Sequence, residues 1–314
     1  MKRIGVLFGM ENTFPGALVD RINSFDMPEV RAEFVTVGGV RMAEPPRYAV
    51  IVDRISHDVP FYRAWLKNCA LGGAYIINNP FWSAADDKFF NYSLASRLGV
   101  AIPRTVILPH KEHPPGTTDR SMRNLQYPID WDAIFEYVGF PAFLKPFDGG
   151  GWRDVHRVNS RDEFFGAYDQ TRTLCMTLQA AVNFTEYFRC YVVGQEVVHV
   201  MPYDPRAPFH DRYIKNPPAY DPALLERVES DCRTICRGLG YDLNTVELAV
   251  ENGVPYAIDF MNPAPDADLH SVGQTNFDWI VGRVAELAVK KALEPRPPVA
   301  YRWDRFLAGS PDAS

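Results

Sequence analysis

The first hundred residues alternate between short apolar runs and amphipathic stretches. The apolar runs have the length of buried strands: KRIGVLFG, AEFVTVGGV, YAVIVDRI and AYIINNP. The stretches that follow them have helical spacing: FPGALVDRIN, PFYRAWLKNCAL and ADDKFFNYSLASRLG. Because strands that alternate with helices form parallel sheets covered by helices, the pattern predicts an N-terminal α/β domain over residues 1–103.

The pattern changes after residue 103. Residues 104–178 predict a smaller unit of strands and helices, in which the proline-bearing stretch 112–130 is a long loop. Residues 179–300 predict an antiparallel sheet with a long helix from about Pro222 and a last helix, and residues 301–314 form a tail. The chain is therefore expected to be α/β, with an α+β C-terminal part.

Composition limits the classes of function. The chain has 314 residues, of which 46% are hydrophobic, enough for a large core in two domains or lobes. A formal net charge of −6 argues against general binding to nucleic acid or an anionic membrane. No apolar run approaches the roughly 18 residues that span a bilayer, and the N-terminus has the pattern of a strand rather than a signal peptide.

The five cysteines lack the spacing of a disulfide framework and fit reduced thiols, so we expect a cytoplasmic protein. Cys232 and Cys236 resemble a metal or redox pair, but both fall on the apolar stripe of the predicted long helix. We expect them in the core.

Lys145 stands just before three consecutive glycines, 149–151, between two predicted strands. Glycines let backbone N–H groups approach phosphate oxygens, although three glycines also make a simple turn. Neither common phosphate-loop signature is present. Strand alternation places Phe143 and Lys145 on one face and Leu144 on the other, so Lys145 can reach out beside the loop. Lys111 ends the preceding strand.

The run INNP…DKFFNYSLASRLGVAIPRTVILPHK…FPAFLKPFDGGGW resembles the ATP-grasp superfamily, in particular the branch of glutathione synthase and the peptide-type glutamate ligases. The resemblance covers nearly the whole chain and implies an ATP-grasp fold behind an N-terminal parallel α/β domain. It implies that Lys111 and Lys145 hold ATP phosphates. The lid over the β and γ phosphates would be Gly149, Gly150 and Gly151, and the base would lie against Gln179, Ala180, Ala181 and Val182.

The hairpin NTVELAVENGVPYAIDFMNP carries two carboxylates whose positions depend on its register. A three-residue loop, 251–253, would place Glu247 and Asp259 together on a face of small side chains. A two-residue NG loop would instead bury Glu247 beside Ile258 and Phe260, which is costly, so we expect the three-residue loop. Two convergent carboxylates suit Mg²⁺. The alternative is a surface hairpin with scattered acids.

The resemblance implies that Glu247, Asp259 and Asn262 bind Mg²⁺, with Mn²⁺ as a substitute. The family has a Glu-x-Asn pair on the second strand, whereas here the spacing from Asp259 to Asn262 is one residue longer. Strict alternation would point Asp259 and Asn262 to opposite faces, and a bulge or a strand end near Met261 would bring them onto the same side. Asp266 or Asp268 could replace Asn262.

Arginines complete the set of candidates. The resemblance implies that Arg189 and Arg212 contact the phosphates or an acyl phosphate, although Arg189 could equally stack on tyrosine at the surface. Arg54, His57 and Arg63 follow a predicted parallel strand, where ligands often bind, and could hold a substrate carboxylate. A helix-capping turn is the other interpretation of that segment.

The resemblance implies an ATP-dependent ligase that joins a carboxylate to an amine through an acyl phosphate and releases ADP. Its substrates would be small molecules of amino-acid or peptide-like type, and a homodimer is compatible with the sequence. The alternatives are a phosphotransferase on the same fold and a nucleotide-binding protein without turnover. No motif identifies the acid or the amine.

Overall fold

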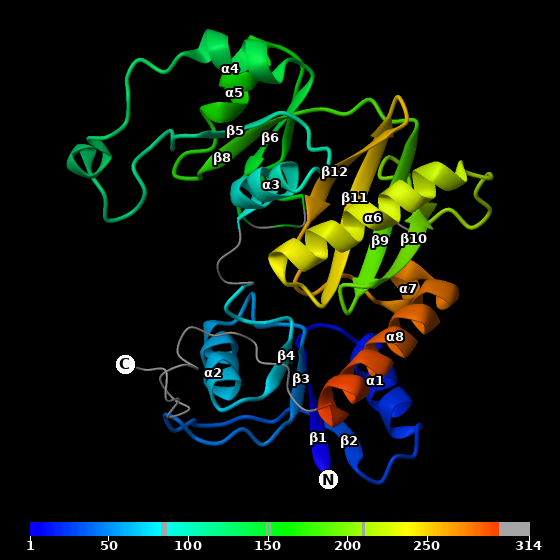
Figure 1. Ribbon diagram of the computed structural model, residues 1–314. Coiled ribbons are helices and arrows are strands. Elements are labelled where there is room, and N and C mark those ends of the chain that lie inside the picture. The colour runs from blue at the N-terminus through cyan, green and yellow to red at the C-terminus, as the bar shows by residue number, and fades with distance from the viewer. Residues whose placement is uncertain (83–86, 149, 151, 209–210, 295–314) are drawn as a thin grey trace, which may run out of the picture.

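Three four-stranded sheets organise the computed structural model, which describes residues 1–82, 87–148, 150, 152–208 and 211–294 (Figure 1). The predictions for Gly149, Gly151 and the 301–314 tail fall outside the described residues. The sheet of the N-terminal strands, sheet A, lies at one end of the molecule (Figure 1). The other two sheets, B and C, lie at the other end (Figure 1).

Sheet A is parallel, in the strand order β2-β1-β3-β4. Its elements are β1 (Lys2–Leu7), α1 (Phe14–Asn23), β2 (Val30–Phe34), β3 (Val50–Asp53), α2 (Pro60–Leu71) and β4 (Tyr75–Ile77). Leu18 of α1 packs with Ile4 and Val6 of β1, and Leu66 of α2 packs with Ile51 of β3 in a separate cluster. This sheet confirms the predicted N-terminal α/β fold.

The last helix, α8 (Gln274–Leu293), returns to the N-terminal sheet. Ile280 and Val284 of α8 share one apolar cluster with β1 and α1, so the two ends of the described chain are packed together. Figure 1 shows α8 running beside α1. The short helix α7 (Leu269–Val272) precedes α8.

Sheet B is antiparallel, in the order β5-β8-β6-β7. Its elements are β5 (Thr105–Leu108), α4 (Trp131–Val138), β6 (Ala142–Pro146), β7 (His156–Val158), α5 (Arg161–Tyr168) and β8 (Met176–Ala180). Asp130 and Ser160 accept backbone N–H groups at the starts of α4 and α5. Both helices pack on the face that carries Leu144 and Leu178. The opposite face carries Lys145. Between β5 and α4 runs a long loop with one 3-10 turn, Asp119–Met122.

Sheet C is antiparallel, in the order β10-β9-β11-β12. Its strands are β9 (Glu186–Val193), β10 (Val197–Pro202), β11 (Leu243–Glu251) and β12 (Val254–Phe260), and its helices are α3 (Lys88–Arg97) and α6 (Pro222–Leu239). One face packs on α6, where Cys232 and Cys236 are completely buried. Their predicted place in the core is confirmed.

The hairpin between β11 and β12 has a register that differs from the prediction. Glu251 pairs with Val254, so the loop consists of Asn252 and Gly253 only. Both loop residues have positive φ, 53° and 74°, as a two-residue type I′ turn requires. The predicted three-residue loop is wrong.

A bulge compensates for the shorter loop. Leu248 pairs with Ala257 and Glu247 pairs with Asp259, so Ile258 is an extra residue on β12. Without a bulge, strict alternation would separate the two carboxylates onto opposite faces. Glu247 and Asp259 share one face, as predicted, but because of the bulge rather than because of a three-residue loop.

Candidate functional site

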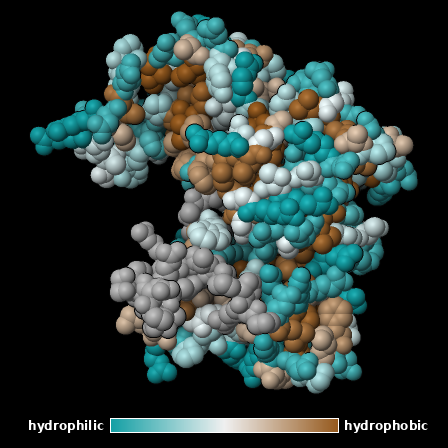
Figure 2. Space-filling model, viewed as in Figure 1, coloured by the Kyte–Doolittle hydropathy of each residue, from teal (hydrophilic) through white to brown (hydrophobic). Residues whose placement is uncertain are grey.

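A cavity of about 520 Å³ lies between sheet C and the face of sheet B that is opposite α4 and α5. Its walls come from β6, β8, β11 and β12, from the first residue of α3 and from loop residues near 183 and 206. In Figure 2, apolar side chains gather where these two sheets approach each other. Mostly apolar walls with a few convergent charges are typical of small-molecule sites.

Lys145 is the cation that β6 projects into the cavity. Leu144 is buried under α4 and α5, whereas Phe143 and Lys145 line the cavity, so the predicted alternation is confirmed. Lys145 Nζ donates to Gln179 Oε1 at 2.9 Å and to the carbonyl oxygen of Ile258 at 3.3 Å. Burial lowers the pKa of Lys145 to about 8 despite the attraction of Asp259.

Lys88 is a second cation that the sequence analysis did not assign. It is the first residue of α3, and its Nζ lies 2.9 Å from Asp259 Oδ1. Asp87 caps the helix by accepting from Phe90 N at 2.7 Å, which fixes where α3 begins. In the sequence, the capping Asp87 indicates where the helix begins and so places Lys88 in its first turn. Only the packing of α3 beside β12 brings the lysine to the site.

Glu247 and Asp259 lie opposite each other on β11 and β12 and line the cavity. Burial raises the pKa of Glu247, and the repulsion of Asp259 adds to this against the attraction of Arg189. Burial also raises the pKa of Asp259, but Lys88 and Lys145 outweigh it and hold the value below its ordinary range. The carboxylate of Glu247 is therefore easier to protonate than that of Asp259.

Arg189 of β9 lies beside Glu247. Its Nε is 3.6 Å from Glu247 Oε1 and is buried with no hydrogen-bond partner among the described residues. Its Nη1 donates to the Tyr213 hydroxyl at 3.2 Å, and its guanidinium carbon is 5.7 Å from the Tyr203 ring centroid. The side chain is only 13% exposed, so the stacking on tyrosine occurs in the interior rather than at the surface.

The structure brings together most of the predicted nucleotide contacts. The cavity is lined by Gly150, Lys145, Gln179, Ala180, Ala181 and Val182. Gln179 is held in place because its Nε2 donates to Thr105 Oγ1 at 2.9 Å while its Oε1 accepts from Lys145.

Four predicted residues of the described part of the chain do not line the cavity: Lys111, Arg189, Arg212 and Asn262. Lys111 Nζ is 2.5 Å from Asp169 Oδ1, and neither Lys111 nor Arg212 is among the described residues that line the cavity. Arg212 Nε donates to the Ala207 carbonyl at 3.2 Å. In the segment that contains Arg212, Arg206 is the arginine that lines the cavity. Its guanidinium carbon lies 4.6 Å from the Phe184 ring centroid.

Asn262 follows the end of β12. Its backbone N–H donates to Asn244 Oδ1 at 2.8 Å, and Met261 before it has φ 75°, so the strand alternation stops there. Asp266 and Asp268, the alternatives to Asn262, accept hydrogen bonds from Ser271, Thr13 and nearby backbone N–H groups.

The charged residues of the cavity fit a Mg²⁺-nucleotide. Within the described residues, no three His, Cys, Asp or Glu side chains lie close enough to hold a metal alone. Mg²⁺ needs only one or two carboxylates when substrate phosphates supply the other oxygens, and Glu247 with Asp259 provides two. Lys88 and Lys145, which line the cavity, are donors for anionic oxygens, and Arg189 lies behind the cavity wall beside Glu247 with its Nε free of hydrogen bonds to the described residues.

Comparisons with known proteins agree with this arrangement. No protein-family model matches the chain. A probable α-L-glutamate ligase of Vibrio vulnificus is 23% identical over 260 residues, which is 79% of each chain. A D-alanine–D-alanine ligase of Polynucleobacter asymbioticus is 25% identical over 166 residues, 46% of this chain and 47% of that protein.

Solved structures match the whole fold. A RimK domain ATP-grasp protein from Sphaerobacter thermophilus has a TM-score of 0.63 at 15% identity and covers 91% of this chain and 99% of its own. The D-alanine–D-alanine ligase of Bacillus anthracis has a TM-score of 0.64 at 16% identity, with coverage of 93% and 98%.

The fold is therefore the ATP-grasp fold, with a parallel N-terminal sheet and two antiparallel sheets around the cavity. The sequence relatives and the fold together support placement in the ATP-grasp superfamily. No described helix is long and apolar enough to cross a membrane.

Proposed function

We propose that this protein is an ATP-dependent ligase that forms a C–N bond between a carboxylate and an amine and releases ADP. One observation carries the proposal: the cavity sets Lys88 and Lys145 against Glu247 and Asp259. Cations and carboxylates that converge in this way suit a triphosphate and its divalent ion. The ligase names of the sequence relatives support the same reaction type.

The proposed reaction has two steps. A carboxylate oxygen of the acid attacks the γ phosphorus of ATP, the bond to the ADP oxygen breaks, and an acyl phosphate forms. The amine then attacks the acyl carbon, loses a proton, and inorganic phosphate leaves. Catalysis of such phosphoryl transfer depends mainly on positioning and charge stabilisation.

The chain's residues have separate tasks in this scheme. Lys145, fixed by Gln179 and the Ile258 carbonyl, places one positive charge beside the phosphates, and Lys88 places another. Arg189, whose Nε lies 3.6 Å from Glu247 and makes no hydrogen bond to the described residues, directs its positive charge toward the transferring phosphoryl group. Glu247 and Asp259 would hold Mg²⁺, for which Mn²⁺ is a substitute, and the bound ion would neutralise phosphate charge.

We further place the protein nearest the branch that contains glutathione synthase and the peptide-type glutamate ligases. The support is that most of the sequence relatives are named probable α-L-glutamate ligases and align over 79% of the chain in the longest cases. The substrates are then an amino acid or peptide-like acid and an amine.

The test is ADP release by the purified protein with Mg²⁺, ATP and pooled amino acids, peptides and polyamines. We expect turnover that requires both an acid and an amine and that falls at least about a hundredfold in Lys145→Ala. Lys290→Ala is the matched control, because Lys290 is an exposed helical lysine 3.8 Å from Glu294. Undiminished turnover in Lys145→Ala would contradict the site, and turnover without any amine would indicate a phosphotransferase.

A further inference from the structure

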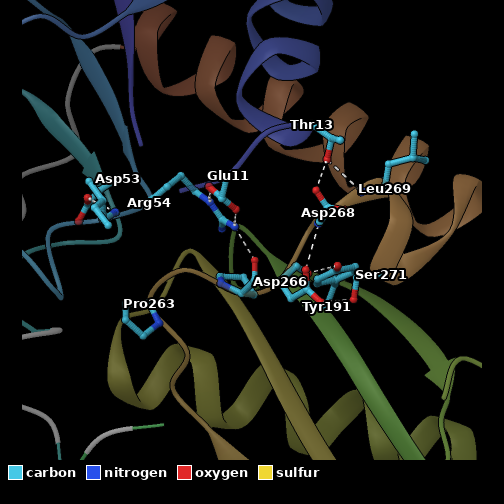
Figure 3. Close-up of polar contacts among 12 residues, drawn as sticks. Glu11, Thr13, Asp53, Arg54, Tyr191, Pro263, Asp266, Asp268, Leu269 and Ser271 are labelled. Atoms are coloured by element: carbon cyan, nitrogen blue, oxygen red, sulfur yellow. Dashed lines mark hydrogen bonds and ion pairs between the residues drawn. The ribbon is translucent and has the colours of Figure 1, made fainter. Parts of the chain in front are cut away.

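Arg54 is a buried arginine at the junction of three segments (Figure 3). Its side chain is 1% exposed. Its Nε donates to Glu11 at 2.9 Å, and its Nη2 donates to the Pro265 carbonyl at 2.5 Å and also to Glu11. Its Nη1 is buried and has no hydrogen-bond partner among the described residues.

The direction of Nη1 is fixed by the rest of the residue. The backbone N–H of Arg54 donates to the Leu7 carbonyl at 2.8 Å, directly after β3. The guanidinium carbon lies 4.9 Å from the Phe14 ring centroid. A guanidinium has five N–H donors in one plane, so pairing at Nε and Nη2 determines where Nη1 points. A buried donor held in this way is prearranged for an acceptor that the chain itself does not supply.

Arg54 lies beyond Arg189 on the side away from the nucleotide cavity. Tyr187, Arg189 and Tyr191 alternate along one face of β9, and neighbours in this series are about 7 Å apart. Tyr187 contacts Glu247 in the cavity, whereas Tyr191 donates to the Asp266 carbonyl, next to the Pro265 that Arg54 contacts. Figure 3 shows Tyr191 and Asp266 on the sheet C side of Arg54.

This position is where the rest of an acid substrate would lie. Arg54 follows the carboxyl end of a parallel strand, the edge of such sheets at which ligands bind. The reacting carboxylate must meet the γ phosphate near Arg189 and Glu247. On the proposed function, an acid that continues past Arg189 and Tyr191 would lead toward Arg54.

We propose that Arg54 binds a second carboxylate of the acid substrate, so that the substrate is an acid with at least two carboxylates. The inference rests on the proposed function and names its substrate class. Guanidinium and carboxylate match in geometry, and Nη1 is the donor that is left for this contact. Glu11 pairs with Nε and keeps the guanidinium oriented rather than competing for Nη1.

The experiment compares each dicarboxylic acid with its mono-amide: glutarate with glutaramate, succinate with succinamate, and L-glutamate with L-glutamine. ADP release is measured with saturating Mg²⁺-ATP and a pooled amine mixture. We expect the wild-type protein to prefer the dicarboxylic member by about tenfold or more in kcat/KM, because an unpaired buried donor discriminates against the wrong partner.

Variants separate recognition from a structural role. Arg54→Gln should remove the preference while leaving the KM for ATP unchanged, and Arg54→Lys should keep part of the preference. Arg47→Gln is the matched control, since Arg47 forms an exposed 2.9 Å pair with Glu33 in the same domain. Thermal unfolding of each variant shows whether it folds. If Arg54→Gln does not fold, the comparison of acids with mono-amides is made with Arg54→Lys.

The outcomes are distinct. The assignment of Arg54 would be overturned if the wild-type protein showed no preference for the dicarboxylic acid. It would also be overturned if the preference survived in folded Arg54→Gln or was undiminished in Arg54→Lys. An equal loss on acids and mono-amides would show that Arg54 only clamps the three segments together. ADP release from no acid at all would overturn the proposed function, and this inference with it.

Discussion

Lys88 and Asp259 are 171 positions apart in the chain and form an ion pair of 2.9 Å at the edge of the cavity. The pair joins the first residue of α3 to the end of β12, so it connects the N-terminal half of the chain to the proposed metal site. Lys88 also contributes to the low pKa of Asp259 by opposing the effect of burial. In the free protein, Lys88 is thus the ion-pair partner of Asp259 Oδ1.

Replacing Lys88 should weaken nucleotide binding. Lys88→Met removes one of the positive charges at the cavity, and we expect the KM for ATP to rise about tenfold, the equivalent of one pKa unit of interaction energy. Steady-state ADP release against ATP concentration measures this. Lys290→Met, at an exposed helical site, should leave the KM unchanged. An unchanged KM in Lys88→Met would exclude a phosphate contact.

ATP binding should weaken as the pH rises above the pKa of Lys145. That pKa is lowered to about 8 by burial, so the lysine is charged below this pH and mostly neutral above it. At pH 9 about a tenth of the free protein keeps the charge, and the Kd of a non-hydrolysable ATP analogue should be about tenfold higher than at pH 7. Binding restores the charge and therefore takes up a proton in this range.

Lys145→Arg is the control for the pH dependence, because arginine stays charged throughout. Its Kd should stay level between pH 7 and pH 9. Calorimetry in buffers of different ionisation enthalpy would detect the proton uptake by the wild-type protein. A level wild-type profile would show that Lys145 does not carry the interaction.

The carboxylate pair should determine the requirement for Mg²⁺. Glu247→Gln and Asp259→Asn each remove one charged oxygen ligand, and we expect the Mg²⁺ concentration for half-maximal ADP release to rise at least about tenfold. Glu229→Gln is the control, because Glu229 pairs with Arg233 on α6, away from the cavity. If all three variants had the same requirement, the metal would be held elsewhere.

A buried phenylalanine of the core between sheet C and α6 should contribute more to stability than a half-exposed one. Phe188 is completely buried in that cluster, so Phe188→Ala should lower the free energy of unfolding by about 3–5 kcal/mol. Phe165 on α5 is 36% exposed, and Phe165→Ala should cost clearly less. Urea unfolding followed by circular dichroism measures both. Similar losses in the two variants would contradict the described packing.

Local alternation was sufficient to predict the face of β6 that carries Lys145. Every second residue of a strand points the same way, and Leu144 is apolar enough to define the buried face. The parallel N-terminal sheet could be predicted for the same reason, because its strands are apolar runs separated by helices.

The sequence could not show features that depend on tertiary packing. Lys88 and Arg206 reach the cavity only because α3 and the 203–208 loop lie beside sheet C. The hairpin register was mispredicted because a turn argument assumes regular pairing, and the extra residue at Ile258 breaks that regularity. The return of α8 to the N-terminal sheet has no local signal either.

The extra residue in β12 also affects how this chain should be aligned with its relatives. The Ile258 carbonyl accepts hydrogen bonds from Lys145 of sheet B and from Tyr92 of α3, at 3.3 and 3.0 Å. A one-residue gap placed at Ile258 keeps Asp259 opposite Glu247. A gap placed after Asp259 would instead put Ile258 opposite Glu247 and shift Asp259 into the position of Phe260, which faces the core. Alignments of this hairpin are therefore informative about the proposed metal site only when their gap falls on the bulge.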